Sequence, residues 1–280
     1  MSVKFLTDSA CDIVPEEAEA LGVEFVPIQI SFADGAYEDA VTITHKEFYE
    51  KLAKSEALPT TSQINPSTYD EYFRRLTAGG DELVVITLSS GLSGTYQSAV
   101  LAAADYADRV FVVDSLNATS GQYILVKRGL ELAARGLSAA EIATILDEEK
   151  MRVRVIALID TLEYLKKGGR ISSTVAFAGS LLGIKPAIEV KEGKIEMAGT
   201  ARGLKKGQQL VRELMDKYNG IDQDKPMAYI YSGSDELLRQ FIASNSELWE
   251  GLGDIPSRSL GGTIGTHIGP GACGVAFFEK

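Results

Sequence analysis

Short apolar runs alternate with amphipathic segments from residue 3 to about residue 150. Four of these runs, rich in Val, Ile, Leu and Phe, are predicted as strands because each is short and bounded by polar residues. They span residues 3–9, 24–32, 82–90 and 109–115. Helix signals fill the intervals between them. Strands that alternate with helices in this way form a parallel sheet with helices on both faces.

The helix signals include recognisable start sites. Thr44 and Glu47 form a capping box, and Asn65 followed by Pro66 is a second helix start. Further helices are predicted over residues 93–107, 117–136 and 138–151. In a sheet of this kind, ligands bind beyond the carboxyl ends of the strands.

The pattern changes after about residue 151. Strands are predicted over residues 153–160, 185–193, 194–200 and 226–233, and amphipathic helices over 203–218 and 234–250. The sequence KEGK at 191–194 is a hairpin-type turn, so this second sheet is at least partly antiparallel. We therefore predict an α/β fold with two domains: an α/β/α parallel-sheet domain over residues 1–152, followed by an α/β domain with a mixed sheet over residues 153–280.

The net charge of −11 argues against a general nucleic-acid-binding protein. Residues 151–206 depart from this balance, because their 11 Lys and Arg against 5 Asp and Glu give a local charge of +6. This basic island is either a solvated face or a docking surface for an anion or a partner. The two cysteines have no metal-site spacing, and we see no signal peptide or membrane span. The expectation is a cytoplasmic protein with no metal or cofactor.

Candidate chemistry begins at residues 89–99, SSGLSGTYQSA, between a predicted strand and a predicted helix. The first N–H groups of a helix lack internal acceptors and lie at the positive end of its dipole. Gly94 allows a ligand to approach the backbone, and Ser93 adds a hydroxyl donor. The stretch is therefore either an anion cradle or an ordinary helix cap. No dinucleotide fingerprint or P-loop is present, and Thr95 replaces the second glycine of a nucleophile elbow.

Two other segments add polar groups. PTTSQ at 59–63 places Thr61 and Ser62 in a loop predicted between two helices, where they could also serve only as turn caps. GGTIGTHIGPGACG at 261–274 holds six glycines, which indicate that the backbone closely approaches another group. We expect this segment to be a loop in which His267 donates a proton or hydrogen bond. His45, and Asp8 and Asp12 near the first strand, are interpreted as structural.

In order along the chain, these segments resemble the motifs of the DegV family of bacterial fatty-acid-binding proteins. The matching motifs are TDSACDI, PTTSQ, SSGLSGTYQSA, VVDS, TLEYLKKGGRIS, GIKP and IGTHIGPGACG. The resemblance covers essentially all 280 residues. Two departures are visible: Ile64-Asn65 replaces a common Pro-Ser, and Gln122 replaces a small or apolar residue. We expect the second departure to affect the shape of the ligand tunnel.

The resemblance implies a carrier subunit that holds one long-chain fatty acid in a buried apolar tunnel. A separate ATP-dependent kinase subunit would phosphorylate the bound carboxylate to an acyl phosphate for phospholipid synthesis, and transient membrane contact would serve ligand exchange. Arg170 and Arg202 match basic family positions near the kinase-facing surface, and His267 joins them in phosphotransfer. The residues implied to meet the carboxylate are Thr61, Ser62, Ser93, Gly94 and His267.

Two enzymatic alternatives stay open at this point. One is a serine hydrolase in which Ser93 is the nucleophile and His267 the base, although no orienting acid is evident. The other is a kinase with its own nucleotide site, which the missing triphosphate loop and metal-ligand cluster weaken. The sequence does not fix acyl length or unsaturation, and segments 117–126 and 172–183 are the candidates for the closed end of the tunnel.

Overall fold

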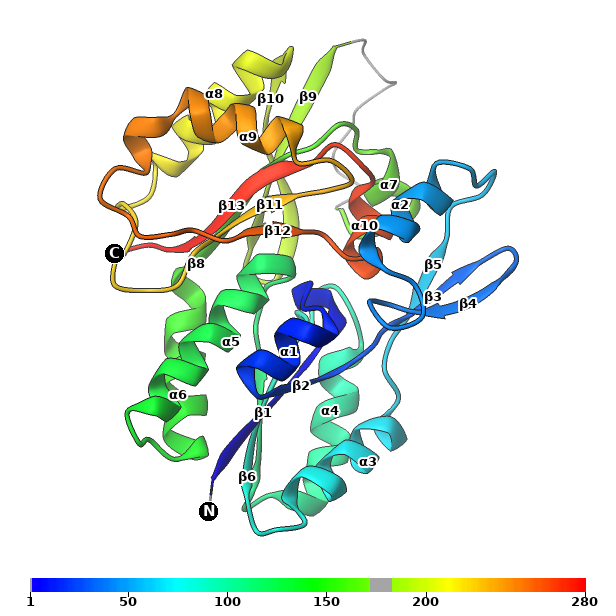
Figure 1. Ribbon diagram of the computed structural model, residues 1–280, viewed down its shortest axis with the longest axis vertical. Coiled ribbons are helices and arrows are strands. Elements are labelled where there is room, and N and C mark those ends of the chain that lie inside the picture. The colour runs from blue at the N-terminus through cyan, green and yellow to red at the C-terminus, as the bar shows by residue number, and fades with distance from the viewer. Residues whose placement is uncertain (1, 172–182) are drawn as a thin grey trace.

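The computed structural model describes residues 2–171 and 183–280. One of the two candidate segments for the tunnel end, residues 172–183, therefore lies outside the described residues except at Gly183. Figure 1 shows a lower and an upper sheet with a helix between them, and a small sheet at one side.

The lower sheet is entirely parallel, as the alternating pattern predicts. Its order is β2-β1-β6-β7. The strands are β1 Val3–Asp8, β2 Val23–Val26, β6 Glu82–Thr87 and β7 Val110–Asp114. One face packs against α1 Pro15–Leu21, α5 Thr119–Ala134 and α6 Ala139–Glu149, and the other against α3 Pro66–Thr77 and α4 Thr95–Ala103. Successive side chains of a strand point to opposite faces, so Phe5 joins the first core and Leu6 the second.

The upper sheet is mixed, with order β10-β9-β8-β13-β11-β12. Among the strands that the structure describes in this sheet, β11 and β12 pair in parallel and the other neighbours pair antiparallel. The strands are β8 Val153–Leu158, β9 Ile184–Lys191, β10 Lys194–Arg202, β11 Ala228–Tyr231, β12 Ser257–Ser259 and β13 Cys273–Phe278. Its outer face carries α8 Leu204–Met215 and α9 Glu236–Ser244. The predicted turn between β9 and β10 is confirmed, and both Glu192 and Gly193 have the positive φ that a type I′ hairpin turn requires.

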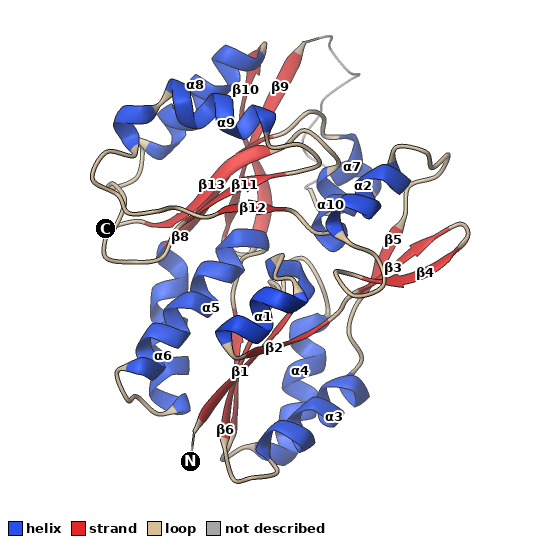
Figure 2. Cartoon of the chain, in the orientation of Figure 1, coloured by secondary structure: helices blue, strands red, loops and turns tan. Residues whose placement is uncertain are grey.

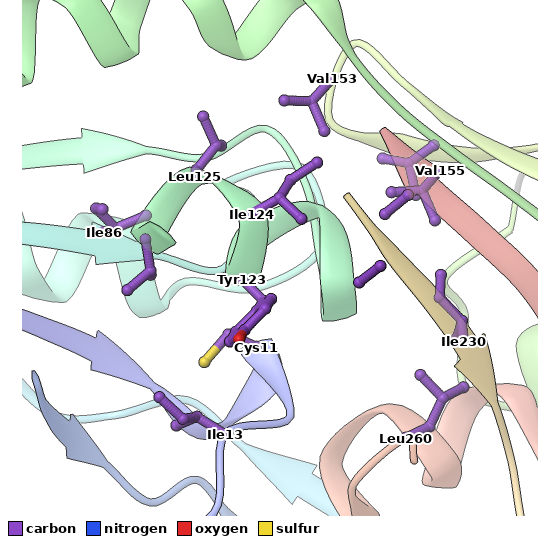
Figure 3. Close-up of a cluster of buried hydrophobic side chains, with 14 of the residues drawn as sticks. Cys11, Ile13, Ile86, Tyr123, Ile124, Leu125, Val153, Val155, Ile230 and Leu260 are labelled. Carbon is purple, nitrogen blue, oxygen red and sulfur yellow. The ribbon is translucent and has the colours of Figure 1, made fainter. Parts of the chain in front are cut away.

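Helix α5 lies between the two sheets and packs against both. Figure 3 shows Tyr123, Ile124 and Leu125 of α5, with Ile86 of the lower sheet on one side and Val155 and Ile230 of the upper sheet on the other. Gly121 is necessary for this contact, because a Cβ there would lie 2.5 Å from a methyl group of Val155. The inner face of the upper sheet and the lower domain therefore share one core.

A third sheet, order β4-β3-β5, was not predicted. It contains β3 Gln29–Phe32, β4 Gly35–Glu38 and β5 Thr60–Ser62, and α2 His45–Leu52 packs beside it (Figure 2). The expected single strand over 24–32 is wrong because Pro27 offers no N–H to continue the ladder. The chain leaves the parallel sheet there. PTTSQ is likewise not a loop, since Thr61 of β5 pairs with Ile30 of β3.

The glycine-rich segment 261–274 is also not a loop. It forms α10 Gly262–Ile268 and then enters β13. What its glycines approach is α2 and β3: a Cβ at Gly262 would lie 2.4 Å from Ile30, and one at Gly265 would lie 2.6 Å from Phe48. The prediction that this backbone closely approaches another group is confirmed, and the groups that it approaches are side chains of the same protein. Gln122, expected to shape the tunnel, is fully buried beside Thr7 and Ile86 instead.

Strand β13 tests how tightly the upper sheet is packed. In Gly274→Ala the new methyl group would meet the Ile156 carbonyl oxygen at 2.2 Å and Ala157 Cα at 2.7 Å, and backbone cannot move aside as a side chain can. We expect a loss of about 2 kcal/mol or more in the free energy of unfolding, measured by urea denaturation. Gly253→Ala is the matched control, because no heavy atom lies within 4 Å of its Cβ. Equal stability of the two variants would contradict this packing.

Candidate ligand-binding site

A cavity of about 280 Å³ lies between the inner face of the upper sheet, α10 and the loops at the carboxyl ends of the lower strands. Its wall is largely apolar. The upper sheet contributes Val155, Ala157, Ile188, Val190, Ile195 and Ile230. Leu88, Leu92 and Ile28 face them from the lower domain, and Ile264 and Ile268 from α10. Such a cavity is near the lower size limit of small-molecule sites and suits an apolar ligand.

Polar groups gather in one part of this wall. Thr61 of β5 and His267 of α10 lie 206 positions apart in the chain, yet Thr61 Oγ1 and His267 Nε2 are 3.0 Å apart. Ser62, Gln63, Ser93 and Gly94 line the cavity with them. The fold thus brings together all five residues expected to meet a carboxylate, two from β5, two from the loop before α4, and His267.

The loop before α4 differs in detail from the expected cradle. Gly94, rather than Ser93, is the N-cap residue, and it makes no side-chain cap. Ser93 Oγ accepts from Thr95 N at 3.3 Å and lies 2.9 Å from Thr95 Oγ1. The group that approaches the Gly94 backbone is the amide of Gln63, which would lie 2.0 Å from a Cβ at that position. Gln63 is a wall residue that the sequence analysis missed.

His267 is neutral in this setting. Burial, together with the nearby Arg170 guanidinium, lowers its pKa from 6.5 to about 4. Its Nδ1 is buried, and none of the described residues hydrogen-bonds to it. Gly168 makes room for the ring, because a Cβ there would lie 2.3 Å from Nδ1. A neutral imidazole keeps one donor and one acceptor nitrogen, so it can donate to an anion without carrying charge itself.

The two arginines expected at a kinase-facing surface lie in different places. Arg170 lines the cavity, where Nε donates to the Leu92 carbonyl and Nη1 to the Gly168 carbonyl. Arg202 ends β10, is exposed and does not line the cavity. Within the described residues, other members of the basic island form ion pairs, including Arg154 with Glu279 and Lys185 with Asp160.

Thr119 also lines the cavity, and it lies in segment 117–126, one of the two candidates for the closed end of the tunnel. Its φ of 52° is unusual for a β-branched residue, and its hydroxyl donates to the Asp12 carboxylate, which holds it there. Asp12 Oδ1 also accepts from Gly261 N at 2.7 Å. Burial raises the pKa of Asp12 to about 7. Asp12 therefore does more than cap a turn, because it links α5 to the start of α10.

Nothing in these hydrogen bonds pairs Ser93 with His267. In the described part of the chain, Ser93 bonds within its own loop and His267 bonds to Thr61. The same part of the chain holds no group of three or more His, Cys, Asp or Glu side chains arranged for a metal ion. It also contains no helix both long and apolar enough to cross a bilayer.

Comparison with known proteins agrees with the geometry. A family model described as "Uncharacterised protein, DegV family" matches residues 2–280. The chain belongs to the DegV family. Protein DegV of Bacillus subtilis is 32% identical over 283 residues, with all of both chains covered. A DegV domain-containing protein of Caldanaerobacter subterraneus is 36% identical, with 99% of each chain covered.

Solved DegV structures share the fold. A fatty-acid-binding DegV family protein from Thermus thermophilus matches at 33% identity and a TM-score of 0.87, with both chains fully covered. A stearic acid-binding protein from Eubacterium ventriosum matches at 29% identity and a TM-score of 0.86, covering 100% of this chain and 99% of that one. Fatty acid binding is thus a property of solved DegV proteins, and the predicted fold class is confirmed.

The protonation of His267 can be measured directly, because the chain has only two histidines. We expect ring-proton NMR to give a pKa near 4, and Arg170→Ala to raise it by removing a nearby cation. As the pH falls, the unfolded chain takes up a proton on this histidine at a higher pH than the folded chain does. The contribution of neutral His267 to the free energy of unfolding is therefore lost as the pH falls from about 6.5 to about 4. Arg202→Ala is the control, and a pKa near 6.5 in the unaltered protein would contradict a buried, neutral ring.

Proposed function

We propose that this chain binds one long-chain fatty acid in the cavity and presents its carboxylate to a separate ATP-dependent kinase subunit, which phosphorylates it. The observation that carries the proposal is the cavity itself, an apolar chamber with its hydroxyls and neutral imidazole gathered in one place. The fatty-acid-binding relatives support the ligand class. The kinase subunit, transient membrane contact for ligand exchange and a cytoplasmic location are parts of the same proposal.

The apolar wall supplies most of the affinity in this proposal. A long acyl chain carries about 15 methylenes, and burial of each contributes ~0.8 kcal/mol, a gross gain of ~12 kcal/mol before ordering costs. The polar groups then only have to offset the desolvation of the carboxylate and fix its position. Hydroxyls and a neutral imidazole are adequate for this and leave a carboxylate oxygen open to a phosphoryl donor.

Arg170 supplies positive charge without clamping the head group. Two of its guanidinium nitrogens already donate to backbone carbonyls. A bidentate hydrogen bond from those two nitrogens to the carboxylate is therefore not available. Its charge still favours the anionic form of the ligand and, during transfer, offsets charge on the phosphoryl group. We therefore assign Arg170 to the cavity and Arg202 to the surface that meets the kinase.

The first test is the organic extract of the purified protein, analysed by mass spectrometry. We expect a long-chain fatty acid at close to one per chain. Thr61→Ala and Ser93→Ala should each retain less, because each removes a hydrogen bond to a charged group, worth on the order of 1.5–3 kcal/mol. Thr144→Ala, an exposed threonine on α6, is the control. A protein that contains no fatty acid and takes none up in a titration would contradict the proposal.

A second experiment separates binding from transfer. Arg202→Ala should leave fatty acid affinity unchanged and slow acyl phosphate formation in the presence of ATP and the partner kinase, because a lost rim charge weakens docking. His267→Ala should slow transfer and also weaken binding, since the ring lines the cavity. Loss of affinity in step with turnover in Arg202→Ala would place that residue in the binding site. Turnover without any kinase would contradict the carrier role.

A further inference from the structure

Helix α10 is a poor helix by its own composition. It spans seven residues, includes Gly262 and Gly265, and is followed by the C-cap residue Gly269, whose φ is 73°. Glycine disfavours helix, and a helix this short is not stable alone. Yet α10 carries His267 and other wall residues of the cavity. Its position must therefore be set by contacts from elsewhere in the chain.

Asp39 provides such a contact at the start of the helix. Its side chain is fully buried, and its two oxygens accept from Gly262 N at 2.8 Å and from Thr263 N at 3.0 Å. Within the described residues, no Lys or Arg forms an ion pair with Asp39, so the two N–H groups and the positive end of the helix offset its charge. Asp39 thus acts as a cap that reaches α10 from more than 220 positions away in the sequence.

The same small sheet holds the other end of α10. Asp39 directly follows β4, β4 pairs with β3, and β3 pairs with β5, which carries Thr61. Thr61 bonds to His267 near the last turn of α10. Gly262 and His267 are five residues apart, roughly 7–8 Å along a helix. Two attachments to one rigid sheet at that separation fix both the axial position and the rotation of the helix.

We propose that Asp39 is a positioning residue of the fatty acid site, which sets His267 against Thr61 by fixing the start of α10. The identity of the ligand in this inference rests on the proposed function, whereas the positioning of α10 rests on the hydrogen bonds of Asp39 and Thr61. Asp39 does not line the cavity, so its substitution can affect the ligand only through neighbouring elements, and α10 is the element whose backbone its side chain holds.

The test substitution is Asp39→Asn, which keeps the size of the side chain but turns an NH₂ group toward one of the two N–H donors. Its matched control is Asp34→Asn, in the turn between β3 and β4, where the carboxylate pairs with Lys51 at the surface and, within the described residues, forms no hydrogen bond with α10. If Asp39→Asn does not fold, Asp39→Ser, with a smaller neutral acceptor, takes its place.

Two readouts are used. Ring NMR of His267 needs no ligand, and we expect its pKa to move toward 6.5 as the ring loses its packed position. Palmitate affinity, measured by displacement of a fluorescent fatty acid, should fall about tenfold in Asp39→Asn and stay unchanged in Asp34→Asn. In a His267→Ala background, Asp39→Asn should cost much less, because the residue through which it acts is gone.

Each outcome decides a separate point. An unchanged His267 pKa and unchanged palmitate affinity in Asp39→Asn, with only the stability lowered, would overturn the positioning role and leave a structural anchor. Full additivity with His267→Ala would overturn it as well. If the unaltered protein binds neither palmitate nor other long-chain fatty acids, the proposed function fails, while a shifted His267 pKa in Asp39→Asn still supports the geometric role.

Discussion

The arrangement of this protein depends on α5, whose buried side chains join the two large sheets in one hydrophobic core. Eleven of its residues are buried, so the helix has little surface left to face water. Gly121 and Gly129 let it approach Val155 on one sheet and Phe5 on the other. Because α5 packs against both sheets within this core, the two sheets cannot shift relative to one another without opening it. The cavity inherits this rigidity, since its walls come from both sides.

Charge pairs reinforce the same junction. Arg258 of β12 is buried, donates to both oxygens of Glu17 on α1 and to the Asp12 carbonyl, and stacks 3.5 Å from the Tyr123 ring centre. A buried ion pair costs desolvation and is strongly destabilising to break once formed. It therefore adds a directional contact to the apolar packing that fixes the two sheets relative to one another.

Much of the fold was predictable because its signals are local. The capping box at Thr44 and the alternation of strand and helix depend on a few neighbouring residues, and the structure has both. The small sheet was missed although Asp34-Gly35 is a hairpin signal. The sequence also could not reveal that Gln63 covers Gly94, or that Asp12 holds Thr119, because these partners lie 31 and 107 positions apart. Only the fold brings such pairs together.

The separation of Thr61 and His267 in the chain has a consequence for the order of folding. Contacts between distant positions form late, since the entropy of closing the intervening loop must be offset first. The strand that follows α10, β13, also lies in the middle of the upper sheet, between β8 and β11. During synthesis, the polar end of the cavity is therefore completed only after nearly the whole chain has emerged. A chain that has not yet formed α10 and β13 therefore lacks the last wall of the cavity, and with it the side that carries His267.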